Sequence, residues 1–180
     1  LNYGVRSMTN EEKEKFETHR KSIRLMLAET LPDLKNLKEL DLTGFDYFEN
    51  LDFLSECTQI EELTIWDSQI EDIHGIKHME NLRILDLSWN PFTDISPLQN
   101  LKHLEAVKLC WVPVKNLEIL TKIPSLKLVM YEPASQEEEV ILQKLESQGV
   151  TVYREASDDW WLWPRQQEKK TTSHSNVSSS

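Results

Sequence analysis

The sequence has few of the residues that build disulfide scaffolds, membrane spans or nucleotide-binding loops. Cys57 and Cys110 are its only cysteines among 180 residues, which is typical of a reducing compartment, so we expect a cytoplasmic protein. No apolar run approaches the roughly 18 residues that span a membrane, and the first stretch lacks the apolar region of a signal peptide. The four glycines form no phosphate-binding loop. Composition therefore favours an ordinary globular domain.

Basic residues are also scarce relative to acids. The chain has 20 Lys and Arg against 31 Asp and Glu, a formal net charge of −11, which argues against nucleic acid or an anionic membrane as the partner. The charge is uneven, because between Asp33 and Asp72 twelve acids accompany only Lys35 and Lys38. Surface acids promote solubility, but an even spread would serve that purpose equally well. The cluster therefore also indicates a protein partner with a basic surface.

What the sequence has in abundance is a repeat. The stretch "LRILDLSWNPFTDI", residues 82–95, recurs along the chain with spacings of 22 or 23 residues. Repeats of this length predict a solenoid, in which each unit buries its apolar residues against the units before and after it. The equivalent apolar positions are Leu37, Ile60, Leu82, Leu104 and Leu126, then the pairs Leu40/Leu42, Leu63/Ile65, Leu85/Leu87, Val107/Leu109 and Val129/Tyr131, then Tyr47, Ile70, Phe92 and Val114.

Each pair predicts a short parallel strand whose leucines point inward. We expect Leu85 and Leu87 to be buried. The predicted strands cover residues 38–43, 61–66, 83–88, 105–110 and 127–131.

Both ends of the repeat array carry helix signals. Thr9 and Glu12 form a capping-box pattern before Phe16, Ile23 and Leu27, whose spacing predicts a helix over residues 9–30 that buries these three side chains against the first repeat. A second pattern, Ser135 and Glu138 with Gly149 as a stop, predicts a helix and a closing strand within residues 133–155. A solenoid requires such caps.

The repeat "DISPLQNLKHLEAVKL" resembles the leucine-rich repeats of the 22-residue class, and is similar to those of the internalins and of the repeat-containing regulator of protein phosphatase 1. The resemblance covers residues 31–132 and implies a right-handed α/β solenoid of about five repeats. It does not specify a function. The mid-repeat asparagine of the family is present only as Asn90, while Phe45, Ser68 and Val112 occupy the other copies, so turn geometry is expected to vary.

We predict a leucine-rich repeat domain over residues 9–155, preceded by a leader or foreign residues at 1–8. Residues 156–180 form a tail that is expected to be disordered at its serine-rich end. Trp160, Trp161 and Trp163 stand in this tail and need burial somewhere. They could form a strap that folds back over the last repeat, a linear docking motif, or foreign sequence.

Residues that could carry catalysis are isolated. His74 and His78 stand four apart, but no third metal ligand is evident, and no histidine is identifiable as a base for Cys110. We predict solvated histidines, a plain thiol, and no catalytic, metal or cofactor site.

The strand positions that face away from the core predict a binding face instead. We expect three tryptophans to act as anchors and five acids to steer a basic partner, with one lysine on the same face. Alternatively, the rings pack into the repeat turns and replace the missing asparagines. The candidate residues are Trp66, Trp89, Trp111, Glu39, Asp41, Glu62, Asp67, Asp86 and Lys108.

The sequence therefore predicts a non-catalytic protein–protein interaction module, monomeric when free. One alternative is an immunity protein that neutralises a bacterial toxin. A second alternative is a regulatory subunit of an enzyme such as a phosphatase.

Overall fold

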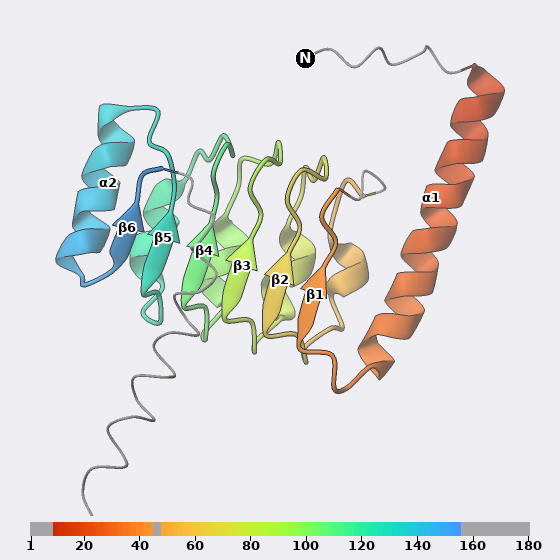
Figure 1. The fold of residues 1–180 in the computed structure, drawn as a ribbon, viewed down its shortest axis with the longest axis horizontal. Helices are drawn as coiled ribbons and strands as arrows, with labels where there is room; N and C mark the ends of the chain where they lie inside the picture. Colours follow the sequence, from red (N-terminus) through yellow and green to blue (C-terminus); the bar gives the residue numbers. More distant parts are fainter. Residues whose placement is uncertain (1–8, 45–47, 156–180) are drawn as a thin grey trace, which may run out of the picture.

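The computed structural model describes residues 9–44 and 48–155, which form a single parallel sheet backed by short helices (Figure 1). The six strands lie side by side in the order of the sequence. The strands are β1 (Glu39–Asp41), β2 (Glu62–Thr64), β3 (Ile84–Asp86), β4 (Ala106–Lys108), β5 (Leu128–Met130) and β6 (Thr151–Tyr153). The helices are α1 (Asn10–Thr30) and α2 (Gln136–Ser147), with 3-10 turns η1 (Leu31–Asp33), η2 (Asp52–Leu54), η3 (His74–His78), η4 (Ser96–Asn100) and η5 (Leu117–Lys122).

The strand register reproduces the sequence repeat. Leu63 pairs with Leu85 and Leu85 with Val107, so equivalent repeat positions become neighbours in the sheet. Leu85 and Leu87 have no exposed surface. The predicted α/β solenoid of leucine-rich repeats is confirmed by this register, because only stacked copies of one unit bring residues 22 apart into line.

The strands are shorter than predicted, at three residues each. Hydrogen bonds between neighbouring repeats continue past them, as from Ile65 N to Asp86 O and from Asp67 N to Ser88 O. The regular ladder then ends because Asp67 and Trp89 adopt the left-handed conformation, which an extended strand does not contain.

The return halves of the repeats lie behind the sheet and complete the core. Leu51, Ile73 and Ile95 directly precede η2, η3 and η4, and Leu117 begins η5. All four are buried in one cluster with the strand leucines.

A column of Asn and Asp side chains starts these 3-10 turns, at a repeat position that the sequence analysis did not single out. Asp72 Oδ1 accepts a hydrogen bond from His74 N at 2.7 Å, and Asp94 Oδ1 accepts one from Ser96 N at 2.8 Å. The next member, Asn116, accepts from Ile95 N at 3.0 Å, so these side chains also link one repeat to the next.

We expect Asp94 to make the fold sensitive to acid. A hydrogen bond from the backbone N–H of Ser96 is the main cause that lowers the pKa of Asp94. Burial acts in the opposite direction, and hydrogen bonds from the Ser96 hydroxyl and the Asn116 amide lower the pKa further. A carboxyl group with a lowered folded-state pKa stabilises the fold above its unfolded value, about 3.9, and this contribution is lost as the pH falls through the folded-state pKa. The free energy of unfolding should therefore decrease below about pH 4.

Urea denaturation between pH 7 and pH 3 measures this effect in the wild type and in Asp94→Asn. The variant keeps an acceptor for Ser96 N but cannot titrate, so its free energy of unfolding should fall less on acidification. Identical pH profiles for the two proteins would contradict the assignment.

Gly75 marks a close backbone approach between two repeats. A Cβ atom at this position would collide with the backbone of Leu51 and Asp52. We expect Gly75→Ala to lower the free energy of unfolding by about 1–3 kcal/mol, because the repeats would have to separate. Thermal denaturation measures this, with Lys77→Ala at an exposed position of the same turn as the control. A melting temperature equal to that of the control would be inconsistent with the stacking described.

Helix α1 begins at the predicted capping box and lies beside the first repeat (Figure 1). Thr9 Oγ1 accepts from Glu12 N at 3.2 Å, and Glu12 Oε2 accepts from Thr9 N at 2.7 Å. Ile23 and Leu27 are partly buried against the main core. The N-terminal capping helix is thus confirmed.

The prediction that Phe16 is buried is wrong, since 36% of this residue is exposed. Arg20 is buried in its place, and pairs with Glu17 at 3.0 Å and with Glu49 at 3.2 Å. The Arg20 guanidinium carbon lies 5.7 Å from the centre of the Phe16 ring. An arginine with carboxylate partners can thus occupy an inward helix position, which the apolar spacing alone did not reveal.

The opposite end carries the predicted helix–strand cap. Ser135 Oγ accepts from Glu138 N at 3.2 Å at the start of α2, and Gly149, with φ of 88°, follows the helix. Leu142 and Leu145 are buried in the main core, and β6 extends the sheet in parallel with β5.

Several predictions lie outside the described residues, namely those on residues 1–8, on Phe45 and Tyr47, and on the tail with Trp160, Trp161 and Trp163. Phe48, the neighbour of Tyr47, is fully buried and stacks on Phe53 with ring centres 4.4 Å apart. Within the described part of the chain, no helix has the length and apolar character needed to cross a membrane.

Candidate functional site

The turn after each of the strands β1 to β4 contains a residue in the left-handed conformation. Gly44, Asp67, Trp89 and Trp111 occupy equivalent positions, with φ of 70°, 55°, 58° and 58°. Glycine adopts this conformation without steric penalty, whereas a bulky residue does so rarely and at an energetic cost. Two successive repeats therefore place a tryptophan where glycine would be the easier choice.

The rings of these two tryptophans stack on the outside of the solenoid. The centres of Trp89 and Trp111 are 5.1 Å apart with 28° between the ring planes, and the two residues are 52% and 60% exposed. Trp66 is 42% exposed and stands one residue before the left-handed Asp67. Ser88 and Cys110 occupy the equivalent position in the next two repeats. Trp66, Trp89 and Trp111 are called the tryptophan edge below.

Other side chains fill the turns in which the rings could have been buried. Asn90 Nδ2 donates to Ile65 O at 2.7 Å and to Leu87 O at 3.0 Å, and Asn90 Oδ1 accepts from Ile70 N at 2.9 Å. In the preceding copy, Ser68 Oγ donates to Leu42 O at 3.3 Å. The turns thus close without the tryptophan rings, which favours an exposed role for them.

Most of the candidate acids lie on the early half of the sheet. Glu39, Asp41 and Asp67 are exposed and Glu62 is partly buried. Lys38, just before β1, forms an ion pair with Glu61, just before β2, with a distance of 2.8 Å between Nζ and Oε1.

Asp86 departs from the expectation of an exposed acid, because it is only 4% exposed. Its carboxylate lies 3.4 Å from Lys108 Nζ and accepts a hydrogen bond from Ser88 N at 3.0 Å. Asp86 and Lys108 therefore form a structural pair within the sheet, and neither is kept in the proposed binding surface.

An open depression lies beside the tryptophan edge, between Trp111 and the start of α2. It is lined in part by Val112, Tyr131, Glu132 and Glu138. Burial is the main cause that raises the pKa of Tyr131. The negative charge of Glu138 and its hydrogen bond with Tyr131 raise that pKa further. The depression therefore holds a neutral phenol and two acidic side chains next to an exposed indole.

The two cysteines lie in different apolar clusters and neither resembles a reactive thiol. Cys57 belongs to the main core, whereas Cys110 packs with Ile84, Ala106, Leu128 and Met130 on the other face of the sheet. Burial raises the pKa of the Cys110 thiol to about 11 and also raises that of Cys57. A thiol of this kind holds little thiolate at neutral pH.

We therefore expect neither cysteine to react with iodoacetamide in the folded protein at pH 8, and both to react once the chain is unfolded in urea. Mass spectrometry after a timed exposure measures the modification of each site. Rapid modification of Cys110 in the folded protein would show that its environment activates the thiol.

The histidines do not gather with other ligands. His74 Nδ1 lies 2.6 Å from Asp72 Oδ1 on the 3-10 turn η3, and His78, on the same turn, is exposed. Among residues 9–44 and 48–155, no three His, Cys, Asp or Glu side chains lie close enough together to hold a metal ion.

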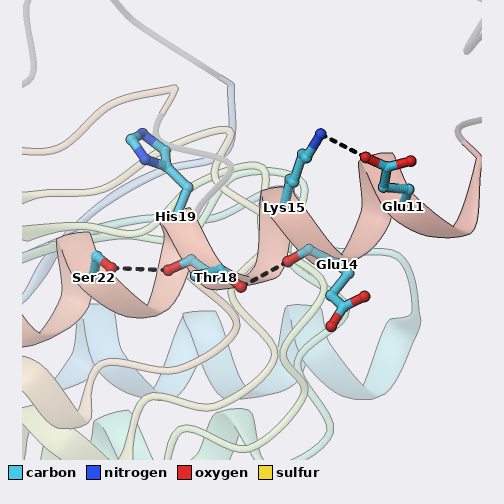
Figure 2. Close-up of a pocket in the computed structure, with 6 residues that line it drawn as sticks. All are labelled: Glu11, Glu14, Lys15, Thr18, His19 and Ser22. Atoms are coloured by element: carbon cyan, nitrogen blue, oxygen red, sulfur yellow. Dashed lines mark hydrogen bonds and ion pairs between the residues drawn. The ribbon is translucent and has the colours of Figure 1, made fainter.

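A second depression, on the outer face of α1, is formed by one helix alone (Figure 2). Lys15 Nζ pairs with Glu11 at 2.7 Å, Thr18 Oγ1 donates to Glu14 O at 2.8 Å, and Ser22 Oγ donates to Thr18 O at 3.0 Å. These bonds run along the helix within successive turns. They give the depression no convergent set of polar groups, so we assign no site to it.

No family model matches the chain, and no curated protein matches it in sequence. The solved structures that it matches include two internalins from Listeria monocytogenes and a leucine-rich repeat protein from Leptospira interrogans. The internalin inlF is 17% identical over 74% of this chain and 54% of its own, with a TM-score of 0.44. Internalin C2 is 18% identical over 68% of this chain and 64% of its own, with a TM-score of 0.45.

The Leptospira protein is 20% identical over 67% of this chain and 38% of its own, with a TM-score of 0.49. This chain thus spans less than two thirds of each of these three chains. The leucine-rich repeat assignment rests on the register of its own strands.

Proposed function

We propose that this chain is a non-catalytic protein–protein interaction module whose binding surface is the tryptophan edge together with the exposed acids Glu39, Asp41 and Asp67 and the partly buried Glu62. The observation that carries the proposal is the stacked pair Trp89 and Trp111, more than half exposed on left-handed backbone. Neither ring fills the core, so burial does not explain two bulky residues in strained positions. Strained residues of this kind concentrate at functional sites.

A protein surface is the ligand that suits this arrangement. Tryptophan supplies a large contact area with little side-chain entropy to lose, and it is enriched among the residues that dominate binding energies. The stack also presents indole faces, which attract arginine and lysine side chains through cation–π interactions. The exposed acids lie on the same sheet, so charge and aromatic surface together favour a partner with basic residues.

A bacterial immunity protein is a second candidate function. The acids gather on the early repeats instead of spreading over the surface, as expected of a surface that covers the basic cleft of a nuclease toxin. No separate observation favours a regulatory subunit of a phosphatase. Both leading candidates are proposed to act in the cytoplasm, where the two free thiols of Cys57 and Cys110 would stay reduced.

Affinity capture from a lysate of the source cells at low salt tests the proposal. The wild type, Trp89→Gly/Trp111→Gly and Glu39→Lys/Asp41→Lys are immobilised in parallel through the N-terminus, and bound proteins are quantified by mass spectrometry. We expect a protein with a basic surface that binds the wild type, is lost from both variants and is released by salt. Equal capture by all three proteins would reject this surface. Inhibition of a captured nuclease by the wild type would select the immunity function.

A further inference from the structure

The late half of the sheet carries a second apolar cluster that is separate from the main core. Its members come from β3, β4 and β5, apart from Cys110, which lies two residues after β4. They stand at positions that alternate with the core residues Leu85, Val107 and Val129. Alternation along a strand places them on the opposite face of the sheet. The members are Ile84, Ala106, Cys110, Leu128 and Met130, called the outer cluster below.

The outer cluster is buried although no described helix contributes to it. Ala106, Leu128 and Met130 have no exposed surface, whereas Glu39 and Thr151, on the same face at the two ends of the sheet, are exposed. Buried apolar residues of α2 and of η2 to η5 belong to the main core, on the other face of the sheet. Within residues 9–44 and 48–155, the cluster consists of residues from β3, β4, β5 and the turn after β4. The sheet itself lies under these side chains, so their burial calls for a further segment over them that excludes water.

We propose that residues 158–165 of this same chain, with the sequence DDWWLWPR, bind across the outer cluster, with Trp160, Trp161 and Trp163 against Leu128, Met130 and Ala106. The segment starts within reach, because the described chain ends at residue 155, directly after β6. Crossing from β6 to β3 covers three strand spacings, roughly 15 Å. Five extended residues span at most about 17 Å, so the linker is long enough for Trp160 to reach any strand of the cluster.

The order of residues in the segment also matches the order of side chains across the sheet. Beyond β3, the same face changes from apolar to acidic, with Glu62 on β2 and then Glu39 and Asp41 on β1. In the tail, the apolar stretch is followed by basic residues, first Arg165 and then the pair at 169 and 170. A segment that runs from β6 towards β1 therefore places tryptophan on apolar strands and cations on acidic ones.

This arrangement has a consequence that rests on the proposed function. Arg165 and the lysines at 169 and 170 offer basic groups, the same chemistry that a partner would bring to the acids of β1 and β2. Residues 165–170 are then an internal competitor for that half of the surface. A partner has to displace them from the acids, while Trp89 and Trp111 remain accessible at the edge.

NMR of the full chain labelled with ¹³C at the methionine methyl groups tests the proposal without any partner. Met130 lies in the outer cluster and Met79 lies in the main core, so Met79 is an internal control. Aromatic ring currents move the resonances of nearby methyl groups. In Trp160→Ala/Trp161→Ala/Trp163→Ala, we expect the Met130 signal to shift and to become broadened by a soluble paramagnetic agent, while Met79 is unchanged. The control Gln166→Ala/Gln167→Ala should leave both signals in place.

A Met130 signal that keeps its position and its protection in the triple variant would overturn the proposal. So would a shift of Met130 caused by deleting residues 1–8 and not by the triple substitution, because the cover would then come from the other terminus. These outcomes are independent of partner capture, so failure of this inference and failure of the proposed function can be told apart.

Discussion

Replacing Leu87 by alanine should lower the free energy of unfolding by about 2–5 kcal/mol. Leu87 has no exposed surface and lies in the main core cluster, between the strands and the 3-10 turns. Its N–H donates to Lys108 O of the next repeat at 3.0 Å, so its backbone is held in place. The surrounding repeats cannot collapse fully into the space, because each is fixed by its neighbours on both sides.

Urea denaturation followed by far-ultraviolet circular dichroism measures this loss. Leu25→Ala is the matched control, since the same atoms are removed from a helix position that is 58% exposed. The control should change the free energy of unfolding by less than about 0.5 kcal/mol. If Leu87→Ala is as stable as Leu25→Ala, the inward orientation of the strand leucines is wrong.

Replacing Trp111 by alanine should weaken binding of the captured partner by about 2 kcal/mol or more, roughly thirtyfold in Kd. Trp111 is the most exposed residue of the tryptophan edge, at 60%. It stacks on Trp89 and also lines the depression beside α2. A partner side chain that enters the depression would contact the ring directly, so truncation removes both the contact area and one wall of the site.

Isothermal titration calorimetry with the purified partner measures the loss, and Trp111→Gly separates binding from folding. Glycine relieves the left-handed backbone at φ of 58°, a gain of about 1 kcal/mol, but removes a ring stack of about the same value. We therefore expect little change in melting temperature and the same loss of affinity as for alanine. A lower melting temperature with full affinity would assign the ring to stability instead.

The sequence predicted those parts of the fold that repeat, because a repeat tests each position several times. The register of Leu63, Leu85 and Val107 follows directly from their spacing of 22 residues. Phe16 was predicted wrongly because it occurs once, in a helix where Arg20 with its two carboxylate partners takes the buried position. The column of Asp72, Asp94 and Asn116 has the same spacing and could have been found, since Asp and Asn commonly begin helical turns.

The candidate site could be predicted only in part. Strand alternation places Glu39 and Asp41 away from the core, and both are exposed. The same rule makes Asp86 an outward residue, but whether such a residue meets water depends on its neighbours across the sheet, here Lys108. The stacking of Trp89 on Trp111 depends on the left-handed turn, a backbone state that tryptophan rarely adopts and that no pattern in the sequence indicated.

The most direct test of the proposed binding surface is hydrogen–deuterium exchange of the protein alone and in complex with the captured partner. The account predicts slower exchange on binding in residues 39–44, 62–69, 88–91 and 110–113, which carry the exposed acids and the tryptophan edge. Residues 74–78 and 96–100, in the 3-10 turns behind the sheet, should exchange at unchanged rates. Protection confined to those turns, with none around Trp89 and Trp111, would contradict the account.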